Sequence, residues 1–328
     1  MSNHRLCLTT YISGTQYQRY IPILLYSLQK SYPEYRVVLF LHEPLDSEIK
    51  AMLARFSLMD NARIIENVFA DCPKMTPLKA CSLRWVLWDD EFSDYEYLYT
   101  IDTDMFYIRE NIDLVDQHVR HMTFCKLPFS NLARLHKTRP YYPVNFLQRI
   151  KHAGARRLFD YLTHPARREK RLSGLHFVDC KKYYAIMNGV ARNQERYAIY
   201  TGDFLNRIFS PDNETFLYRM LEDHGFDMSK IGFQHDSISM LSPDNPERLE
   251  FRPHHGIHLG CFRADLELLH QTNGLGGILD SVVYKEYVMQ FRMKILPDAK
   301  FRELLLLQPD SIRSAFQKIG QYYGFNLN

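Results

Sequence analysis

Residues 95–108 read YEYLYTIDTDMFYI and place two aspartates, Asp102 and Asp104, at the end of a run of strand-forming residues. Side chains two positions apart on a strand point to the same side, so both carboxylates can face one site. Two hard oxygen ligands suit Mg²⁺ or Mn²⁺, and magnesium usually binds through one or two carboxylates plus substrate phosphates. Since a lone Asp-x-Asp pattern is more often a solvated turn, its meaning depends on the chain around it.

The hundred residues up to this point alternate between strand and helix patterns. Strand patterns occupy 5–12, 35–43, 62–69 and 95–102, and helical spacing of apolar residues occupies 19–33, 46–56 and 76–92. Asp46 or Ser47 suits the cap of the second helix. The alternation predicts an α/β fold, a mainly parallel sheet flanked by helices. Ligands of such sheets bind beyond the carboxyl ends of the strands, where Asp102 and Asp104 are expected.

Composition limits the class of protein. The chain has 328 residues, of which 46% are hydrophobic and 14% aromatic, enough for a large core in one big α/β domain or two small ones. No apolar run is long enough for a signal peptide or a bilayer span, so we expect a cytoplasmic location. The six cysteines form neither CxxC pairs nor a regular spacing, which indicates buried thiols.

Charge is unevenly spread along the chain. Net charge is +3, yet residues 120–171 hold 13 Lys and Arg against Asp160 and Glu169. Such an excess would attract phosphate-bearing or otherwise anionic partners, although a solvated helical surface explains it equally well. We expect this segment to contact such a partner.

The tail from 276 to 328 has a helical pattern. Residues 282–296, VVYKEYVMQFRMKIL, and 311–325, SIRSAFQKIGQYYGF, both alternate basic and large apolar residues. Such segments can lie on a membrane or pack on a partner chain. The more ordinary interpretation is that they are helices closing the catalytic core.

Four pieces of the chain, taken in order, resemble the GT-A fold glycosyltransferases. The resemblance is greatest to family 8, which includes glycogenin and bacterial lipopolysaccharide glucosyl- and galactosyltransferases, and it spans about 5–263. The pieces are LCLTTYISGTQYQRYIPILLYSLQKSYP, LKACSLRWVLW, YLYTIDTDMFYI and HHGIHLGCFR. The resemblance implies a GT-A (Rossmann-like) catalytic domain over 1–275, with 276–328 as a helical C-terminal extension.

The resemblance also implies roles for residues of the first three pieces. Thr9, Thr10 and Tyr11, on the first strand and its loop, would hold the uridine. Asp102 and Asp104 would hold the metal and the ribose. Lys79 or Arg84, on the helix, would contact the sugar or its phosphate.

The last of these pieces, HHGIHLGCFR at 254–263, also supports a metal site on physical grounds. A neutral imidazole beside two carboxylates would complete a site suited to manganese; His258 is the first choice and His255 the second. Gly260 lets backbone approach the diphosphate, and Arg263 can pair with a departing phosphate. A loop whose histidines bond to backbone groups is the alternative.

The late piece departs from the family 8 pattern. That family usually has a His three residues before the Gly and a Lys three residues after it, followed by Pro-Trp. Here the first gap is shorter, Arg263 replaces the Lys, and Ala264 and Asp265 follow. A sister family therefore remains an open alternative.

Acidic residues in the middle of the chain are candidates for stabilising the reacting sugar carbon. Residues 210–226 resemble the helix that carries such residues in this fold, and Glu214 lies in its first turn, where the helix dipole favours a carboxylate. Asp203 is a second candidate. Asp212 is expected to cap the helix.

These observations predict a metal-dependent, retaining hexosyltransferase. It would move galactose or glucose from a UDP-sugar to a glycan or glycolipid acceptor in bacterial lipopolysaccharide O-antigen or capsule synthesis, using Mn²⁺ or Mg²⁺. In that setting the basic segment 120–171 would meet a phosphorylated glycolipid, with peripheral contact at the inner membrane surface. Three alternatives stay open: an inverting GT-A enzyme, a nucleotidyltransferase, and a non-catalytic protein that binds anionic ligands or nucleic acid. The first strand lacks the Gly-rich phosphate loop that a nucleotidyltransferase would favour, and nucleic acid is not the expected partner. The sequence leaves the oligomeric state open.

Overall fold

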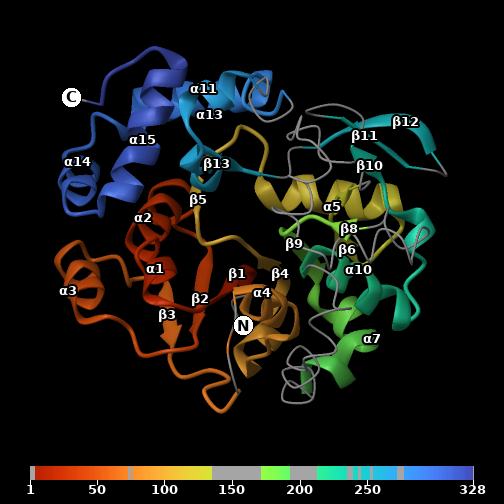
Figure 1. Cartoon of the computed structure of the whole chain (residues 1–328). Helices are drawn as coiled ribbons and strands as arrows, with labels where there is room; N and C mark the ends of the chain where they lie inside the picture. Colours follow the sequence, from red (N-terminus) through yellow and green to blue (C-terminus); the bar gives the residue numbers. More distant parts are fainter. Residues whose placement is uncertain are drawn as a thin grey trace, which may run out of the picture.

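A six-stranded sheet forms the centre of the protein (Figure 1). The computed structural model describes residues 4–72, 75, 77–134, 171–192, 213–234, 239–242, 245–251, 254–271 and 277–327. In spatial order the strands are β3 (Ala62–Ile65), β2 (Arg36–Leu41), β1 (His4–Ile12), β4 (Tyr95–Thr100), β9 (His176–Asp179) and β6 (Phe129–Ser130). The first four run parallel, and β9 is antiparallel to both β4 and β6. The predicted α/β fold with a mainly parallel sheet is confirmed.

Helices follow the strands as the alternation predicted, with one difference. The N-terminal helices are α1 (Thr15–Gln18), α2 (Ile21–Ser31), α3 (Ser47–Arg55) and α4 (Pro77–Leu83). The Asp46 carboxylate caps α3 by accepting from the amides of Glu48 and Ile49. The predicted helix over 76–92 is shorter: α4 passes into the 3₁₀ turn η1 (Arg84–Val86), and Leu87 is extended. Asp89 then caps a second 3₁₀ turn, η2 (Asp90–Asp94).

The two faces of the sheet bury two separate cores, because successive residues of a strand point to opposite faces. On β1, Leu6, Leu8 and Ile12 belong to a core shared with α2, α3 and the C-terminal helices. Cys7 and Tyr11 belong to the other core, which is shared with three helices on the opposite face. These helices are α4, α7 (Cys180–Arg192) and α10 (Asn213–Asp223).

Two smaller sheets lie beside the main one. One has the order β12 (Asn245–Glu250), β11 (Ser239–Ser242), β10 (Phe233–Gln234), β7 (Ala133–Arg134) and β8 (Arg171–Leu172). The other pairs β13 (Gly256–His258) antiparallel with β5 (Met105–Tyr107). This short ladder brings the segment HHGIHLGCFR, residues 254–263 and called the late motif below, to the end of the central strand β4.

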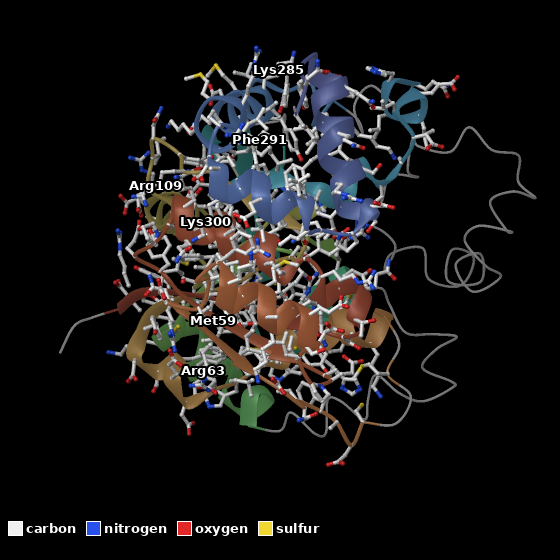
Figure 2. The ribbon with its side chains drawn as sticks, turned by 90° about the vertical axis from the view of Figure 1, so that its left-hand side faces the viewer. Met59, Arg63, Arg109, Lys285, Phe291 and Lys300 are labelled. Carbon is white, nitrogen blue, oxygen red and sulfur yellow. The ribbon has the colours of Figure 1, made fainter. Side chains whose placement is uncertain are left out.

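The C-terminal helices close the first core. They are α13 (Val282–Gln290), the π-helical η6 (Phe291–Ile295), α14 (Ala299–Leu306) and α15 (Asp310–Tyr323), preceded by η5 (Leu259–Arg263) and α11 (Leu266–Gln271). Rings of Phe301 and Phe316 lie 5.7 and 5.5 Å from the ring of Phe106 on β5. Figure 2 shows these helices lying against the N-terminal half of the chain. The division of the chain at 275 and 276 stays a prediction.

Two further findings concern the remaining predictions. The basic segment, 120–171, begins within α5 (Leu114–Cys125), but its residues 135–170 lie outside the described residues, as does the candidate Asp203. No described helix combines the length and the hydrophobicity that a bilayer-spanning segment requires.

Candidate active site

Two distant segments meet where β4 ends. Asp102 and Asp104 lie in the short connection from β4 to β5, at the carboxyl end of the parallel strands. β13 lies beside β5, with His258 opposite Met105 (Figure 1). The backbone amide of Leu259 donates to the carbonyl of Asp104 at 2.8 Å. The structure thus brings the late motif onto the aspartates, as their proposed roles require.

The Asp104 carboxylate binds two basic side chains. Its Oδ1 lies 3.1 Å from Nε2 of His258, and its Oδ2 accepts from Nη2 of Arg263 at 2.8 Å. Burial alone would raise the pKa of Asp104, but His258 and Arg263 lower it to about 2. Conversely, Asp104 raises the pKa of His258 well above its usual value, against the opposing effect of burial. Asp104 is therefore an ionised carboxylate held between two cations.

Position 260 needs a glycine because a side chain would not fit there, and not because of its backbone conformation. A Cβ atom at this position would collide with the Asp104 carboxylate and lie 3.0 Å from Nε2 of His258. Any larger residue would push η5 away from the aspartate.

The Asp102 carboxylate binds Arg84 of η1. Arg84 is only 8% exposed; burial would lower its pKa, but the carboxylates of Asp102 and Glu214 help to raise it. Gly174 permits this ion pair, since a Cβ there would lie 2.8 Å from Nη2 of Arg84 and 3.1 Å from Oδ2 of Asp102. Gly174 lies two residues before β9, and the sequence had indicated no role for it.

Glu214 lies near Arg84 at the start of α10. Its Oε2 is 3.0 Å from Nη1 of Arg171, and both side chains are 15% exposed. Nε1 of Trp85 donates to the carbonyl of Asn213 at 3.1 Å, which ties the start of α10 to η1. Glu214 therefore pairs with Arg171, the last residue of the basic segment, and its charge also acts on Arg84 of the aspartate site.

The residues predicted to hold the uridine lie on β1. Thr9 and Thr10 are buried, and Oγ1 of Thr9 has no hydrogen-bond partner in the described part of the chain. The Tyr11 hydroxyl donates to the carbonyl of Val68 at 3.0 Å, and its buried ring packs edge-on against Phe69. Lys79 is 3% exposed on α4.

His255, the second choice of metal ligand, has both ring nitrogens occupied. Nδ1 lies 2.8 Å from Oε2 of Glu110, and Nε2 lies 3.0 Å from Nε2 of His118. The residue is fully buried, with a left-handed backbone φ of 51°. We therefore leave it out of the proposed metal site. The sequence could not indicate this cluster, because His118 and His255 are 137 positions apart.

The types of ligand at this site suit a divalent metal, but their present arrangement does not. Two carboxylates and an imidazole are ligands that Mg²⁺ or Mn²⁺ accepts. Within the described ranges, however, no three His, Cys, Asp or Glu side chains are arranged to hold a metal ion. Arg84 and Arg263 occupy the carboxylates instead. The donor chemistry fits and the present geometry does not, so the metal remains a prediction.

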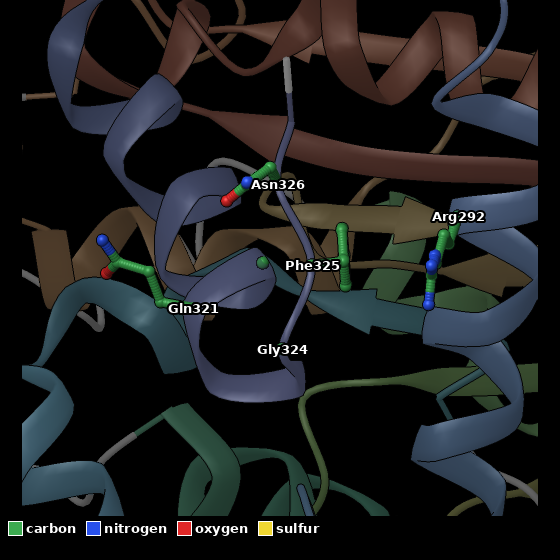
Figure 3. Close-up of a pocket in the computed structure, with 6 residues that line it drawn as sticks. Arg292, Gln321, Gly324, Phe325 and Asn326 are labelled. Carbon is green, nitrogen blue, oxygen red and sulfur yellow. The ribbon is translucent and has the colours of Figure 1, made fainter.

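A recess elsewhere does not belong to this site. It has a volume of about 400 Å³ and lies between η6 and the end of α15 (Figure 3). Its lining residues are Arg292, Gly320, Gln321, Gly324, Phe325 and Asn326.

Comparison with known proteins found weak structural likeness only. No family model and no curated protein matches the chain. The mannosyltransferase Ktr4p of S. cerevisiae, in complex with GDP, is 11% identical over 73% of this chain and 72% of its own, with a TM-score of 0.42. Core-mannan synthase A of Aspergillus fumigatus, in its Mn/GDP form, is 10% identical over 77% and 80%, with a TM-score of 0.38. The galactosyltransferase LgtC, with donor and acceptor sugar analogues, is 12% identical over 68% and 81%, with a TM-score of 0.33.

Proposed function

We propose that this protein is a GT-A glycosyltransferase that moves a hexose, galactose or glucose, from a UDP-sugar to a glycan or glycolipid acceptor. The observation that carries the proposal is the convergence of Asp102, Asp104 and Arg84 with His258 and Arg263 at the carboxyl end of a parallel sheet. This edge is where α/β sheets bind their ligands. Two arginines held by two carboxylates suit a ligand that brings both phosphate and a metal.

Sugar transfer breaks the bond between the anomeric carbon and the diphosphate, so negative charge grows on the leaving UDP. Arginine suits this task because its planar group can donate two hydrogen bonds to one phosphate. Arg263 is 44% exposed at its side chain and can reach a ligand, whereas Arg84 is buried. Preorganised positive charge of this kind stabilises a transition state without reorganisation during the reaction.

We assign the metal site to Asp102, Asp104 and His258, with Mn²⁺ or Mg²⁺ as the ion. Bound there, the ion would neutralise charge on the diphosphate. Its binding would require Arg84 and Arg263 to release the carboxylates, and the exposed guanidinium group of Arg263 would then be available to the phosphates. Asp102 would also meet the ribose.

The donor's uridine is assigned to β1. The Thr9 hydroxyl, which lacks a partner in the described residues, would gain one from the nucleoside, and the ring of Tyr11 would pack on the base. Thr10 and Lys79 complete this group, and Lys79 would approach the sugar or its phosphate. Glu214, with Asp203 as the second candidate, would stabilise the positive charge that develops at the anomeric carbon.

The wider setting belongs to the same proposal. We assign the reaction to bacterial lipopolysaccharide O-antigen or capsule synthesis, in the cytoplasm at the inner membrane surface. We expect the basic segment 120–171 to contact the acceptor; most of it lies outside the described residues.

A thermal-shift panel of nucleotide sugars, with and without Mn²⁺, tests the proposal. We expect one UDP-sugar to raise the unfolding temperature in the presence of Mn²⁺, because a ligand that binds only the folded state stabilises it. Asp104→Asn should lose this shift, and Asp71→Asn, at an exposed carboxylate, should keep it. If no nucleotide sugar shifts the temperature and nucleic acid binds with a steep salt dependence, the non-catalytic alternative replaces this one.

A further inference from the structure

The buried face of α13 is attached to the candidate site. The hydroxyl of Tyr284 accepts a hydrogen bond from the backbone amide of His258 at 2.8 Å. The hydroxyl of Tyr287 donates to Glu110, which in turn contacts His255. Both tyrosines are almost fully buried. These contacts tie the helix to β13 and to the residue before it.

The opposite face of α13 continues into η6 and is open to solvent. Val282, Met289 and Met293 are 66, 54 and 62% exposed. The exposed cations among them are Lys285, Arg292 and Lys294. These six residues are called the outer face below. Lys285 lies at one end of the molecule, beyond the buried Phe291 (Figure 2).

The composition of the outer face points to an anionic lipid surface. Binding of a helix to a bilayer interface grows with the apolar area it buries and with the attraction of Lys and Arg to anionic lipids, and the outer face offers both. Glu286, the one acidic residue between 282 and 295, is half-buried and lies on the same side of the helix, four residues after Val282 and three before Met289, so the excess charge of this side is positive. On one side the outer face borders the recess that Arg292 shares with Gln321 and Asn326 (Figure 3).

A second copy of the chain fits this face less well. A two-fold symmetric dimer would bring the same patch of both copies together. Three cations and one half-buried carboxylate of one copy would then face the same set of the other copy, and the excess of like charge destabilises such a contact. An anionic bilayer offers the opposite charge and also accepts the valine and methionine side chains.

We propose that the outer face of α13 and η6 docks on an anionic phospholipid surface. The buried face of the same helix holds β13, so docking would keep His258 about one helix diameter, roughly 10–12 Å, from the lipid head groups. The link from this docking to a glycolipid acceptor rests on the proposed function, whereas the docking on anionic lipid does not.

Vesicle flotation of the full chain tests the docking. Vesicles of phosphatidylcholine alone are compared with vesicles containing an equal amount of phosphatidylglycerol, without any nucleotide sugar. We expect binding to the anionic vesicles only. Lys285→Glu with Arg292→Glu should reduce the partition coefficient at least about tenfold, since each cation near an anionic surface contributes several-fold. Met289→Gln with Met293→Gln should reduce it several-fold by removing the inserted apolar groups.

Matched controls lie on α7. Lys181→Glu with Lys182→Glu changes net charge by the same amount at exposed positions, and Ile186→Gln replaces an apolar side chain that is 46% exposed. These variants should bind like the wild type, and circular dichroism should show that all variants are folded.

Three results would overturn the docking: no vesicle binding by the wild type, equal binding to both vesicle types, or equal losses in the α7 controls. Sedimentation that shows a dimer abolished by the methionine substitutions, without vesicle binding, would make the outer face a contact between copies. The docking and the proposed function can fail separately, because flotation needs no donor and the thermal-shift panel needs no vesicle.

Discussion

Asp104 is the residue on which the candidate site depends most. It touches His258, Arg263 and, through its carbonyl, Leu259. It therefore joins the end of β4 to the late motif by both side chain and backbone. A substitution that changes only the side chain distinguishes the side-chain contacts of Asp104 from its backbone hydrogen bond.

We expect Asp104→Asn to reduce turnover by about 100-fold or more while the chain stays folded. The amide has nearly the same size but lacks the charge that would hold a metal, and the backbone bond to Leu259 remains. Losses of this order accompany removal of one electrostatic group from an active site. Turnover of the donor found in the thermal-shift panel, with circular dichroism as the folding control, provides the measurement. Wild-type turnover and metal affinity in the variant would remove Asp104 from the site.

His258 and His255 should respond to substitution in opposite ways. We expect His258→Ala to weaken Mn²⁺ binding in calorimetric titration with little loss of stability, because its side chain is 28% exposed. His255→Ala should leave Mn²⁺ affinity nearly unchanged but lower the free energy of unfolding by about 3–5 kcal/mol. It removes one partner of a buried pair and leaves the Glu110 carboxylate without its imidazole. The reverse order of Mn²⁺ affinities would move the ligand to His255.

At the scale of elements, α5 and β9 hold histidines that the fold keeps neutral. His118 and His121 lie on α5 and His176 on β9, all fully buried or nearly so. Burial lowers the pKa of His121 and His176 to about 3. His118 is lowered well below its usual value, by burial and then by its histidine neighbours. Hydrogen bonds to Ser130 join the two α5 histidines.

These lowered pKa values predict loss of stability in mild acid. The unfolded chain takes up protons as the pH falls through about 6.5, while the folded chain does not. The contribution of these three histidines to stability is therefore full above that pH and declines toward about pH 3, by up to about 1.4 kcal/mol per pH unit for each histidine. Urea unfolding from about pH 8 to about pH 5 measures the effect, a range above the lowered pKa values of Asp104 and Glu110.

His121→Gln is the matched variant for this effect. It removes one titrating group and keeps a side chain that can hydrogen-bond to Ser130. Its stability should depend less steeply on pH than that of the wild type. An unchanged slope would mean that His121 does not contribute to the acid sensitivity.

At the scale of the whole molecule, the fold brings Glu214 of α10 to the edge where the aspartates lie. Glu214 is paired with Arg171 rather than free to take a proton from an acceptor. This favours a role as an electrostatic stabiliser and hence retention of configuration. We expect proton NMR of the product from an α-linked donor to show an α-linkage. A β-linkage would reject both retention and the role of Glu214, and the metal proposal would survive, because either reaction must neutralise a departing diphosphate.

The sequence by itself determined the elements that depend on local chemistry. The four parallel strands and the helices between them follow from apolar spacing over a few residues, and Asp46 caps α3 through amides two and three positions away. The place of Asp102 and Asp104 at a strand end is equally local. The end of α4 was harder to predict, because η1 holds Arg84 against Asp102 by a contact outside the helix.

Only the tertiary structure determined that two histidines of the late motif, His255 and His258, enter different surroundings. His255 and His258 are three positions apart, and the backbone at His255 is left-handed, so their side chains enter different surroundings. One enters the buried cluster with Glu110 and the other meets Asp104. Likewise, the space that requires a glycine at 174 and 260 is set by side chains from distant parts of the chain. Such contacts depend on which elements pack together, and no pattern of neighbouring residues encodes that directly.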